Sequence, residues 1–271
     1  MTFRSSVLLQ KVMQAVRVAK FGDPDVCVVS KVPIPSPGST QVLIKSKYVG
    51  INPVDTYIRT GTYPIKPDLP YTPGADCAGI VESVGSDVTQ FKAGDPVFTV
   101  RTVTGSYAEY TVAESQHTYA LNIQKLSFEH GASLGTPYFT TYRALVLSVR
   151  SSFYLALFTV CCRAKAKAGE TVFIHGASGG VGTICVQMAK HLGLRVLATA
   201  GTEEGLGIVR DCGADFTYNH RQPDYMEKIM EDTGGKGVDI ILEMLANVNL
   251  QSDLQSWRKR SGLWLWATEG Q

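Results

Sequence analysis

The sequence predicts an α/β protein in which a β-barrel-like front domain is followed by a domain of alternating strands and helices. Two observations predict this division. Up to about Leu126, short segments rich in β-branched residues are separated by closely spaced proline and glycine turns. From Ser127 onward, apolar strands alternate with helical patterns, as in βαβ units. A chain of 271 residues is long enough for two such domains.

Composition excludes several classes of function. The formal net charge is only +2 and no basic stripe is present, so nothing in the sequence demands nucleic acid. The six cysteines are scattered without a CxxC pair, which favours reduced thiols and a cytoplasmic location over disulfides. No run is long and apolar enough to span a bilayer, so no membrane association is expected. Residues 1–12 are predicted to be a loose N-terminal tail, with a fragment of an organelle-targeting sequence as the alternative.

The front domain is predicted to span residues 13–126. Its expected strands are residues 14–18, 26–29, 41–45, 79–85 and 96–100. Ser127 then has the character of an N-cap, and a helical stretch with Pro137 as a new start runs to Leu145.

The second domain, residues 127–271, contains the most informative stretch of the chain. An apolar strand at 171–174 ends abruptly in a turn with glycines at 176, 179, 180 and 182, and apolar residues at helical spacing follow. Such glycines allow backbone N–H groups to approach a pyrophosphate at the positive end of a helix. The alternative is a tight turn without a ligand. Further strands at 194–200 and 238–243 complete a βαβ context and favour nucleotide binding.

Several separate motifs resemble the zeta-crystallin branch of the medium-chain dehydrogenase/reductase superfamily. They are Asn52–Arg59, Pro70–Asp76, Gly105–Tyr110, His175–Gly182, Asn219–Arg221 and Glu243–Leu250. The resemblance implies a GroES-like catalytic domain, a Rossmann domain, NADPH as cofactor and a quinone as the small-molecule substrate. Whether electrons pass in pairs or singly stays open. The resemblance also implies a homo-oligomer, an expectation weakened by the unusual end of this chain.

The resemblance assigns residues to the cofactor. It places Ser178, Gly179, Gly180 and Val181 along the pyrophosphate, Gly201 and His220 at the adenosine end, and Asn249 near the nicotinamide. Two residues of the front domain are candidate catalytic residues. Tyr57 is expected to form a wall of the nicotinamide pocket, with core packing as the alternative role. Asn52 is expected to donate a hydrogen bond to a quinone oxygen, with a buried turn at Asn52-Pro53 as the alternative.

Zinc is not expected as a cofactor. Asn52 and Ala75-Asp76 stand where the zinc-dependent relatives have a cysteine and a His-Glu pair, and these residues cannot replace that ligand set. A quinone is already electron-poor, so hydride can be added to it without a Lewis acid. NADPH is favoured over NADH because the strand ending in Thr199-Ala200-Gly201-Thr202 has no carboxylate at its tip.

Two segments depart from the family pattern. Residues 146–163 are an atypical, apolar insertion, and residues 255–271 form a divergent tail that is consistent with a shifted reading frame. The Rossmann sheet is therefore expected to be incomplete after Glu243, and the activity of this chain is expected to be poor. The alternative functions are non-enzymatic binding of AU-rich RNA, a structural role in the lens, and a zinc alcohol dehydrogenase, which Asn52 and Ala75-Asp76 disfavour.

Overall fold

The computed structural model describes residues 11–146, 166–243, 249, 251, 253, 254, 256, 264 and 265. Contacts divide the chain into two compact units, Met1–Thr136 (unit 1) and Pro137–Gln271 (unit 2). This division falls inside helix α2 (Phe128–Leu145), ten residues after the boundary predicted at residue 126. Val146 continues α2 through a bond from its N–H to the carbonyl of Tyr142. The rest of the predicted insertion lies outside the described residues.

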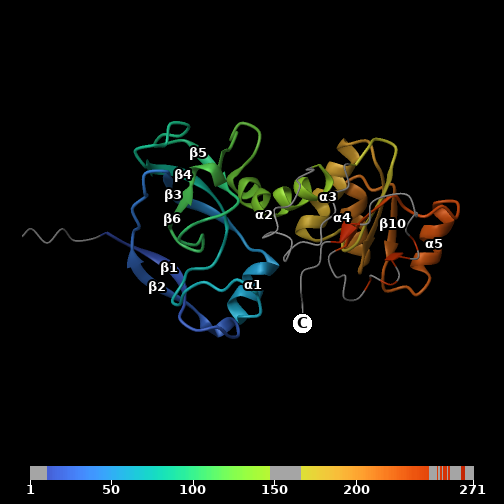
Figure 1. The fold of residues 1–271 in the computed structure, drawn as a ribbon, viewed down its shortest axis with the longest axis horizontal. Coiled ribbons are helices and arrows are strands. Elements are labelled where there is room, and N and C mark those ends of the chain that lie inside the picture. Colours follow the sequence, from blue (N-terminus) through green and yellow to red (C-terminus); the bar gives the residue numbers. More distant parts are fainter. Residues whose placement is uncertain are drawn as a thin grey trace, which may run out of the picture. The chain divides into compact units, whose positions relative to one another are not determined.

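Unit 1 is built from antiparallel β-strands (Figure 1). Strands β1 (Val12–Val18) and β2 (Cys27–Pro33) form a two-stranded sheet. The other sheet has the order β6-β3-β4-β5-β7 and forms a half-barrel. Its strands are β3 (Gln41–Gly50), β4 (Asp76–Val84), β5 (Pro96–Thr99), β6 (Tyr110–Glu114) and β7 (Thr118–Ala120). The five strands expected in this region therefore all exist, although β1 to β4 are longer than expected, and β6 and β7 were not predicted.

The unit 1 core lies inside this half-barrel. It is formed by Val42, Ile44, Cys77, Val81, Val88, Val97 and Ala113. Three short helices lie at the connections: η1 (Pro24–Val26), α1 (Pro53–Thr60) and η2 (Ser115–His117). Of these, α1 positions the front-domain candidates Asn52 and Tyr57, and the sequence did not predict it as a helix.

Unit 2 contains a parallel sheet with the order β10-β9-β8-β11-β12. The strands are β8 (Thr171–Ile174), β9 (Arg195–Ala200), β10 (Phe216–Asn219), β11 (Ile240–Glu243) and β12 (Trp264–Leu265). The connecting helices are α3 (Gly180–His191), α4 (Glu203–Asp211) and α5 (Tyr225–Asp232). β10 was not predicted, although it ends at the Asn219 of a recognised motif.

The expectation that no strand follows Glu243 is wrong for the backbone of Trp264 and Leu265. These residues form β12 and pair in parallel with Leu242 and Glu243. Before them, Asn249, Gln251, Asp253, Leu254 and Ser256 have helical backbone. The predicted tail thus adds a strand to the sheet, because backbone hydrogen bonding depends less on side-chain identity than the family comparison assumed. The rest of the tail lies outside the described residues.

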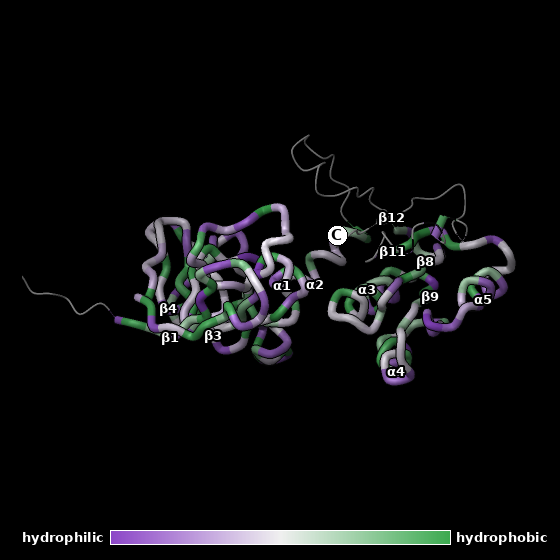
Figure 2. Tube along the Cα trace, turned by 90° about the horizontal axis from the view of Figure 1, so that it is seen from below, coloured by the Kyte–Doolittle hydropathy of each residue, from purple (hydrophilic) through white to green (hydrophobic). Residues whose placement is uncertain are grey.

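Helices cover both faces of the unit 2 sheet. One hydrophobic cluster joins β8 and β9 to α3 and α4, and includes Val172, Val186, Val196 and Val209. A second cluster on the other face joins Phe173, Leu197 and Ile241 to Ile229 of α5. Figure 2 shows both hydrophobic and hydrophilic stretches on α4, as expected for a helix with one buried side. Within the described part of the chain, no helix is long and apolar enough to cross a bilayer.

Candidate functional site

The turn between β8 and α3 has the backbone geometry that the sequence predicted. Gly176 has a φ of 54°, in the left-handed region that favours glycine. The N–H of Ala177 donates to the carbonyl of Thr199 at 2.7 Å, which attaches the turn to the end of β9. The first intrahelical bond of α3 runs from Thr183 N–H to the carbonyl of Gly179. The N–H groups of residues 180, 181 and 182 therefore have no partner within the helix.

Two kinds of glycine build this turn. At Gly182 a Cβ would lie 2.5 Å from the Cα of Ala177, so only glycine allows the helix to pack this closely on the turn. At Gly179 a Cβ would have only the Gly176 carbonyl within 4 Å, at 3.4 Å, and at Gly180 only Pro137, at 3.9 Å. Gly179 and Gly180 are both exposed. The turn is thus tight behind the helix and open at its positive end, which suits an anion such as pyrophosphate.

A second group of candidate residues lies at the tips of β9 and β10. A Cβ at Gly201 would lie 2.9 Å from Nε2 of His220 and 3.2 Å from Nε of Arg221. The structure therefore brings Gly201 and His220 together, as the resemblance implied. Partial burial, followed by the charges of Arg221 and His175, lowers the pKa of His220. Arg221 was not among the predicted site residues, although its position beside His220 in the Asn219–Arg221 motif was a usable signal.

The edge of this group is formed by the first turn of α4. Thr202 caps α4, since its side chain accepts a hydrogen bond from Gly205 N–H. A Cβ at Gly205 would lie 3.1 Å from both Oγ of Ser178 and Cβ of Ala200. Ser178 therefore faces α4 across the turn, and Gly205 leaves space between them. Val181 occupies the first turn of α3 and is half-buried.

The front-domain candidates belong to a buried polar network at the start of α1. Asn52 donates from Nδ2 to Oδ2 of Asp76 at 2.8 Å, and its backbone N–H donates to Oδ2 of Asp55 at 2.8 Å. Tyr107 donates its hydroxyl proton to the same Asp55 oxygen at 2.8 Å. Thr136 donates both its N–H and its hydroxyl to Asp76. Burial is the main cause that raises the pKa of both Asp55 and Asp76.

This network does not fit a zinc ion. Both oxygens of Asp76 accept hydrogen bonds, and Asn52 uses its amide as a donor toward that carboxylate. Ala75 offers no side-chain ligand, and the hydrogen bonds between Asn52 and Asp76 leave no set of convergent donor atoms. The expected buried-turn role of Asn52 is observed, because the residue caps α1 with only 7% of its surface exposed. Its second amide N–H remains available to a ligand.

Two further predicted residues are placed individually. Tyr57 lies on α1 and is half-buried. Asn249 has helical backbone and is half-buried in unit 2. Tyr107, which the sequence analysis quoted only as part of a motif, is hydrogen-bonded to Asp55 and is thereby tied to the start of α1.

Known proteins match both units. Residues 38–123 match the alcohol dehydrogenase GroES-like domain family, and residues 180–267 match the zinc-binding dehydrogenase family. The quinone oxidoreductase of Sus scrofa is 54% identical over 246 residues, which cover 90% of this chain and 70% of that protein. The human quinone oxidoreductase is 52% identical with the same coverage.

Solved structures agree with these matches. The quinone oxidoreductase of Escherichia coli, solved in complex with NADPH, has a TM-score of 0.78 and 30% identity, covering 92% of this chain and 72% of that one. The quinone oxidoreductase of Pseudomonas syringae has a TM-score of 0.79 and 29% identity, covering 93% of this chain and 72% of that one. The predicted α/β fold, with a GroES-like and a Rossmann domain, is confirmed.

Proposed function

The chain belongs to the quinone oxidoreductase family of the medium-chain dehydrogenases/reductases, and from this premise we propose that it catalyses NADPH-dependent reduction of quinones. Bound NADPH supplies a hydride, and a proton from solvent completes the conversion of the quinone to a hydroquinone. The residues of the chain bind and orient the two partners, and no residue has to stabilise an alkoxide. A reaction that needs only binding and orientation by the protein is consistent with an Asn52–Asp76 network that offers no zinc site.

The observation that carries the proposal is the open positive end of α3. Ser178, Gly179, Gly180 and Val181 surround N–H groups that have no partner within the helix, and both glycines are exposed. A pyrophosphate there would accept hydrogen bonds from these N–H groups and would be stabilised by the helix dipole. The tight packing of Gly182 on Ala177 keeps the N–H groups in a fixed direction.

Selectivity for NADPH follows from the tips of β9 and β10. No carboxylate occupies the end of β9, where NAD-dependent proteins bind the ribose 2′-hydroxyl. Instead, Gly201 leaves space beside His220 and Arg221. The Arg221 guanidinium would pair with a 2′-phosphate through charge-assisted hydrogen bonds, and the His220 ring would contact the adenosine.

The remaining assignments concern the reacting end of the cofactor. We assign Tyr57 to the wall of the nicotinamide pocket, Asn249 to the nicotinamide side, and the second amide N–H of Asn52 to a quinone oxygen. These roles rest on the family resemblance together with the partial exposure of Tyr57 and Asn249.

A homo-oligomer and a cytoplasmic location stay predictions. The four cysteines in the described part of the chain, Cys27, Cys77, Cys185 and Cys212, have free thiols.

The direct test is to follow NADPH oxidation by the purified chain with a para-quinone, and with a primary alcohol and NADP⁺ in parallel. We expect turnover with the quinone that is slow, in line with the poor activity expected of this chain, and that chelators do not inhibit. We expect no turnover with the alcohol. Alcohol oxidation that requires added zinc would overturn the proposal. Salt-dependent RNA binding without NADPH turnover would instead favour the non-enzymatic alternative.

A further inference from the structure

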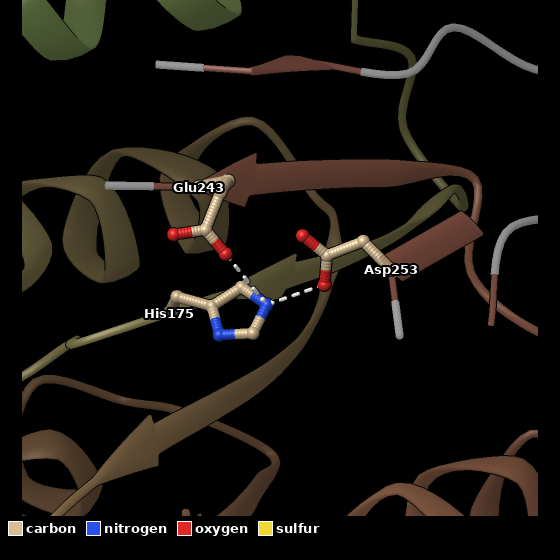
Figure 3. A group of neighbouring side chains, drawn as sticks. All are labelled: His175, Glu243 and Asp253. Carbon is tan, nitrogen blue, oxygen red and sulfur yellow. Dashed lines mark hydrogen bonds and ion pairs between the residues drawn. The ribbon is translucent and has the colours of Figure 1, made fainter. Parts of the chain in front are cut away.

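Unit 2 contains a buried group of three ionisable side chains that the proposed reaction does not use. Nε2 of His175 lies 2.7 Å from Oδ1 of Asp253 and 3.1 Å from Oε2 of Glu243 (Figure 3). All three atoms lie within 4.8 Å of one another. The exposed fraction is 5% for His175 and 0% for both acids. We call His175, Glu243 and Asp253 the buried triad.

The parallel sheet brings the members of the buried triad together. β8 and β11 are neighbours, with Ile174 opposite Leu242. His175 comes directly after Ile174 and Glu243 directly after Leu242, so both lie at the same edge of the sheet. The backbone N–H of His175 donates to the carbonyl of Leu242 at 3.0 Å, which fixes this register. Asp253 approaches from the helical backbone after β11. The end of β8 and the segment from Glu243 to Asp253, which are far apart in the sequence, therefore direct nitrogen and oxygen ligand atoms at one point.

The buried triad places two carboxylic acids against a single imidazole. Acids in the interior are paired, protonated or bound to a metal, because a buried charge without a partner is costly. Oδ2 of Asp253 is buried and receives no hydrogen bond in the structure, so this acid still has an acceptor oxygen to offer.

We propose that the buried triad is a binding site for a divalent transition-metal cation, with zinc as the best chemical match. Zinc takes nitrogen and oxygen ligands at about 2.0–2.2 Å in tetrahedral geometry, which places two ligand atoms roughly 3.3–3.6 Å apart. The 3.1 Å separation of His175 and Glu243 has to widen by only about 0.2 Å to reach this range. The 2.7 Å separation of His175 and Asp253 has to widen by roughly 0.6 Å, in exchange for a metal bond from each.

The site is distinct from the zinc positions of the alcohol dehydrogenases. Those correspond to Asn52 and Ala75-Asp76 in unit 1, which do not fit a metal, whereas the buried triad lies entirely in unit 2. A bound cation would have a structural role. It would fix the segment that carries Asn249 and Asp253 to the end of β8, next to the glycine turn that begins at Gly176. The metal would thereby stabilise the second half of the sheet.

The test uses the full-length chain and measures metal directly. The chain is treated with a chelator, desalted and titrated with Co²⁺, whose visible absorption reports nitrogen and oxygen coordination, and Zn²⁺ then competes for the site. We expect stoichiometric Co²⁺ binding, displacement by Zn²⁺, and an increase in melting temperature with either ion. His175→Gln should weaken binding more than about 100-fold, because it removes a direct ligand. His191→Gln, which changes an exposed histidine at the end of α3, should leave binding unchanged.

Two outcomes would overturn the proposal. One is a wild-type chain that shows neither Co²⁺ absorption nor a Zn²⁺-dependent change in melting temperature, which would mean that the buried triad is held by protons alone. The other is equal metal binding by the wild type and by both Asp253→Asn and Glu243→Gln. If His175→Gln fails to fold, the wild-type titration and these two variants decide the question. None of these readouts depends on NADPH or quinone, so the result is separate from that of the proposed function.

Discussion

The first helix of unit 1 and the first helix of the unit 2 sheet begin in opposite ways. α1 begins at a buried asparagine, and Asp55 in its first turn accepts the backbone N–H of Asn52. α3 begins at Gly179, which has no side chain to cap the helix. The N–H groups at the start of α1 are thus partly satisfied by the protein itself. Those at the start of α3 are left for a ligand.

This difference separates a structural helix start from a binding one. At α1, carboxylates already occupy the positive end of the helix, so an anionic ligand would be repelled. At α3, glycine removes every competing side chain and leaves the same helix dipole uncompensated. We therefore expect the cofactor at the start of α3 and not at the start of α1. Substitutions that make one start resemble the other test this interpretation.

The strongest effect is expected from Gly179→Asp, which places a carboxylate at the start of α3, as Asp55 does in the first turn of α1. Each lost hydrogen bond to a charged group costs about 1.5–3 kcal/mol, so losing two weakens NADPH binding by roughly 100-fold or more. Aspartate is a favourable N-cap, and the φ of −80° at Gly179 accepts it, so the free protein should melt at the same temperature or slightly higher. Calorimetric titration with NADPH and thermal melts of the free chain measure the two effects.

Gly179→Ala is the matched control for that variant. It adds a Cβ whose nearest neighbour is the Gly176 carbonyl at 3.4 Å, an ordinary contact, and it adds no charge. NADPH affinity should fall by less than about tenfold, since the N–H groups remain in place. Equal affinity of the wild type and Gly179→Asp would show that the turn is only structural.

Asp76→Ala removes a carboxylate beside the start of α1 and should destabilise that part of unit 1. It leaves the amide of Asn52 and both donors of Thr136 without their buried acceptor. The expected loss is about 3 kcal/mol in the free energy of unfolding of unit 1. The three tryptophans lie at positions 257, 264 and 266, so their fluorescence reports unit 2 only. Hydrogen-exchange mass spectrometry of β4 peptides is therefore the measurement, with exposed Asp68→Ala as control.

A weaker effect is expected from Arg221→Ala, which changes cofactor selectivity. Removing one charge-assisted partner of the 2′-phosphate should weaken NADPH binding about tenfold and leave NADH binding nearly unchanged. Arg210→Ala is a suitable control, because Arg210 is an exposed arginine of α4 that bonds Thr217. Binding constants for both cofactors decide the matter. A parallel loss of NADH affinity would mean that Arg221 supports the fold of the β10 tip.

The sequence predicted what depends on local pattern. Alternation and turn residues located β1 to β5 of unit 1 but not β6 and β7, and the glycines with helical spacing located α3 and the open turn. It did not predict β10, whose four residues include the polar Thr217 and Asn219, because a strand this short is recognisable only from its pairing with β9. The hydrogen bonds from Asn52 to Asp76 and from Tyr107 to Asp55 join residues 24 and 52 positions apart, so no local pattern announces them.

The expectation that the remaining strands of the sheet have no counterpart was wrong at residues 264–265 for a related physical reason. Residues 264–265 pair with β11 through backbone groups, which any non-proline residue provides. A family-based reading of side chains therefore underestimated the sheet. Arg221 and the buried triad were missed because their significance depends on strand order, which places β10 beside β9 and β11 beside β8.

The mildest change is expected from Asp55→Asn, which removes the negative charge of Asp55 at the start of α1 and keeps an oxygen that can accept hydrogen bonds. The asparagine oxygen can still accept from Asn52 N–H and from the Tyr107 hydroxyl, so the fold should be kept. Burial raises the pKa of Asp55 above its ordinary 3.8, and the nearby charge of Asp55 contributes to the raised pKa of Asp76. A raised carboxyl pKa means that the folded state binds the proton more tightly. Its stabilising effect is therefore complete below pH 3.8 and is lost as pH rises through the raised value.

Unit 1 of the wild type should accordingly lose stability as pH rises from about 4 toward neutrality, and Asp55→Asn should flatten that dependence. Hydrogen exchange of β4 and β6 peptides across this range, corrected for the intrinsic exchange rate, measures the slope. Asp68→Asn changes an exposed carboxyl and should keep the wild-type slope. An unchanged slope in Asp55→Asn would show that Asp55 is ionised at equal cost in the folded and unfolded states. In that case the hydrogen bonds from Asn52 and Tyr107 would offset the full cost of burying the Asp55 carboxylate.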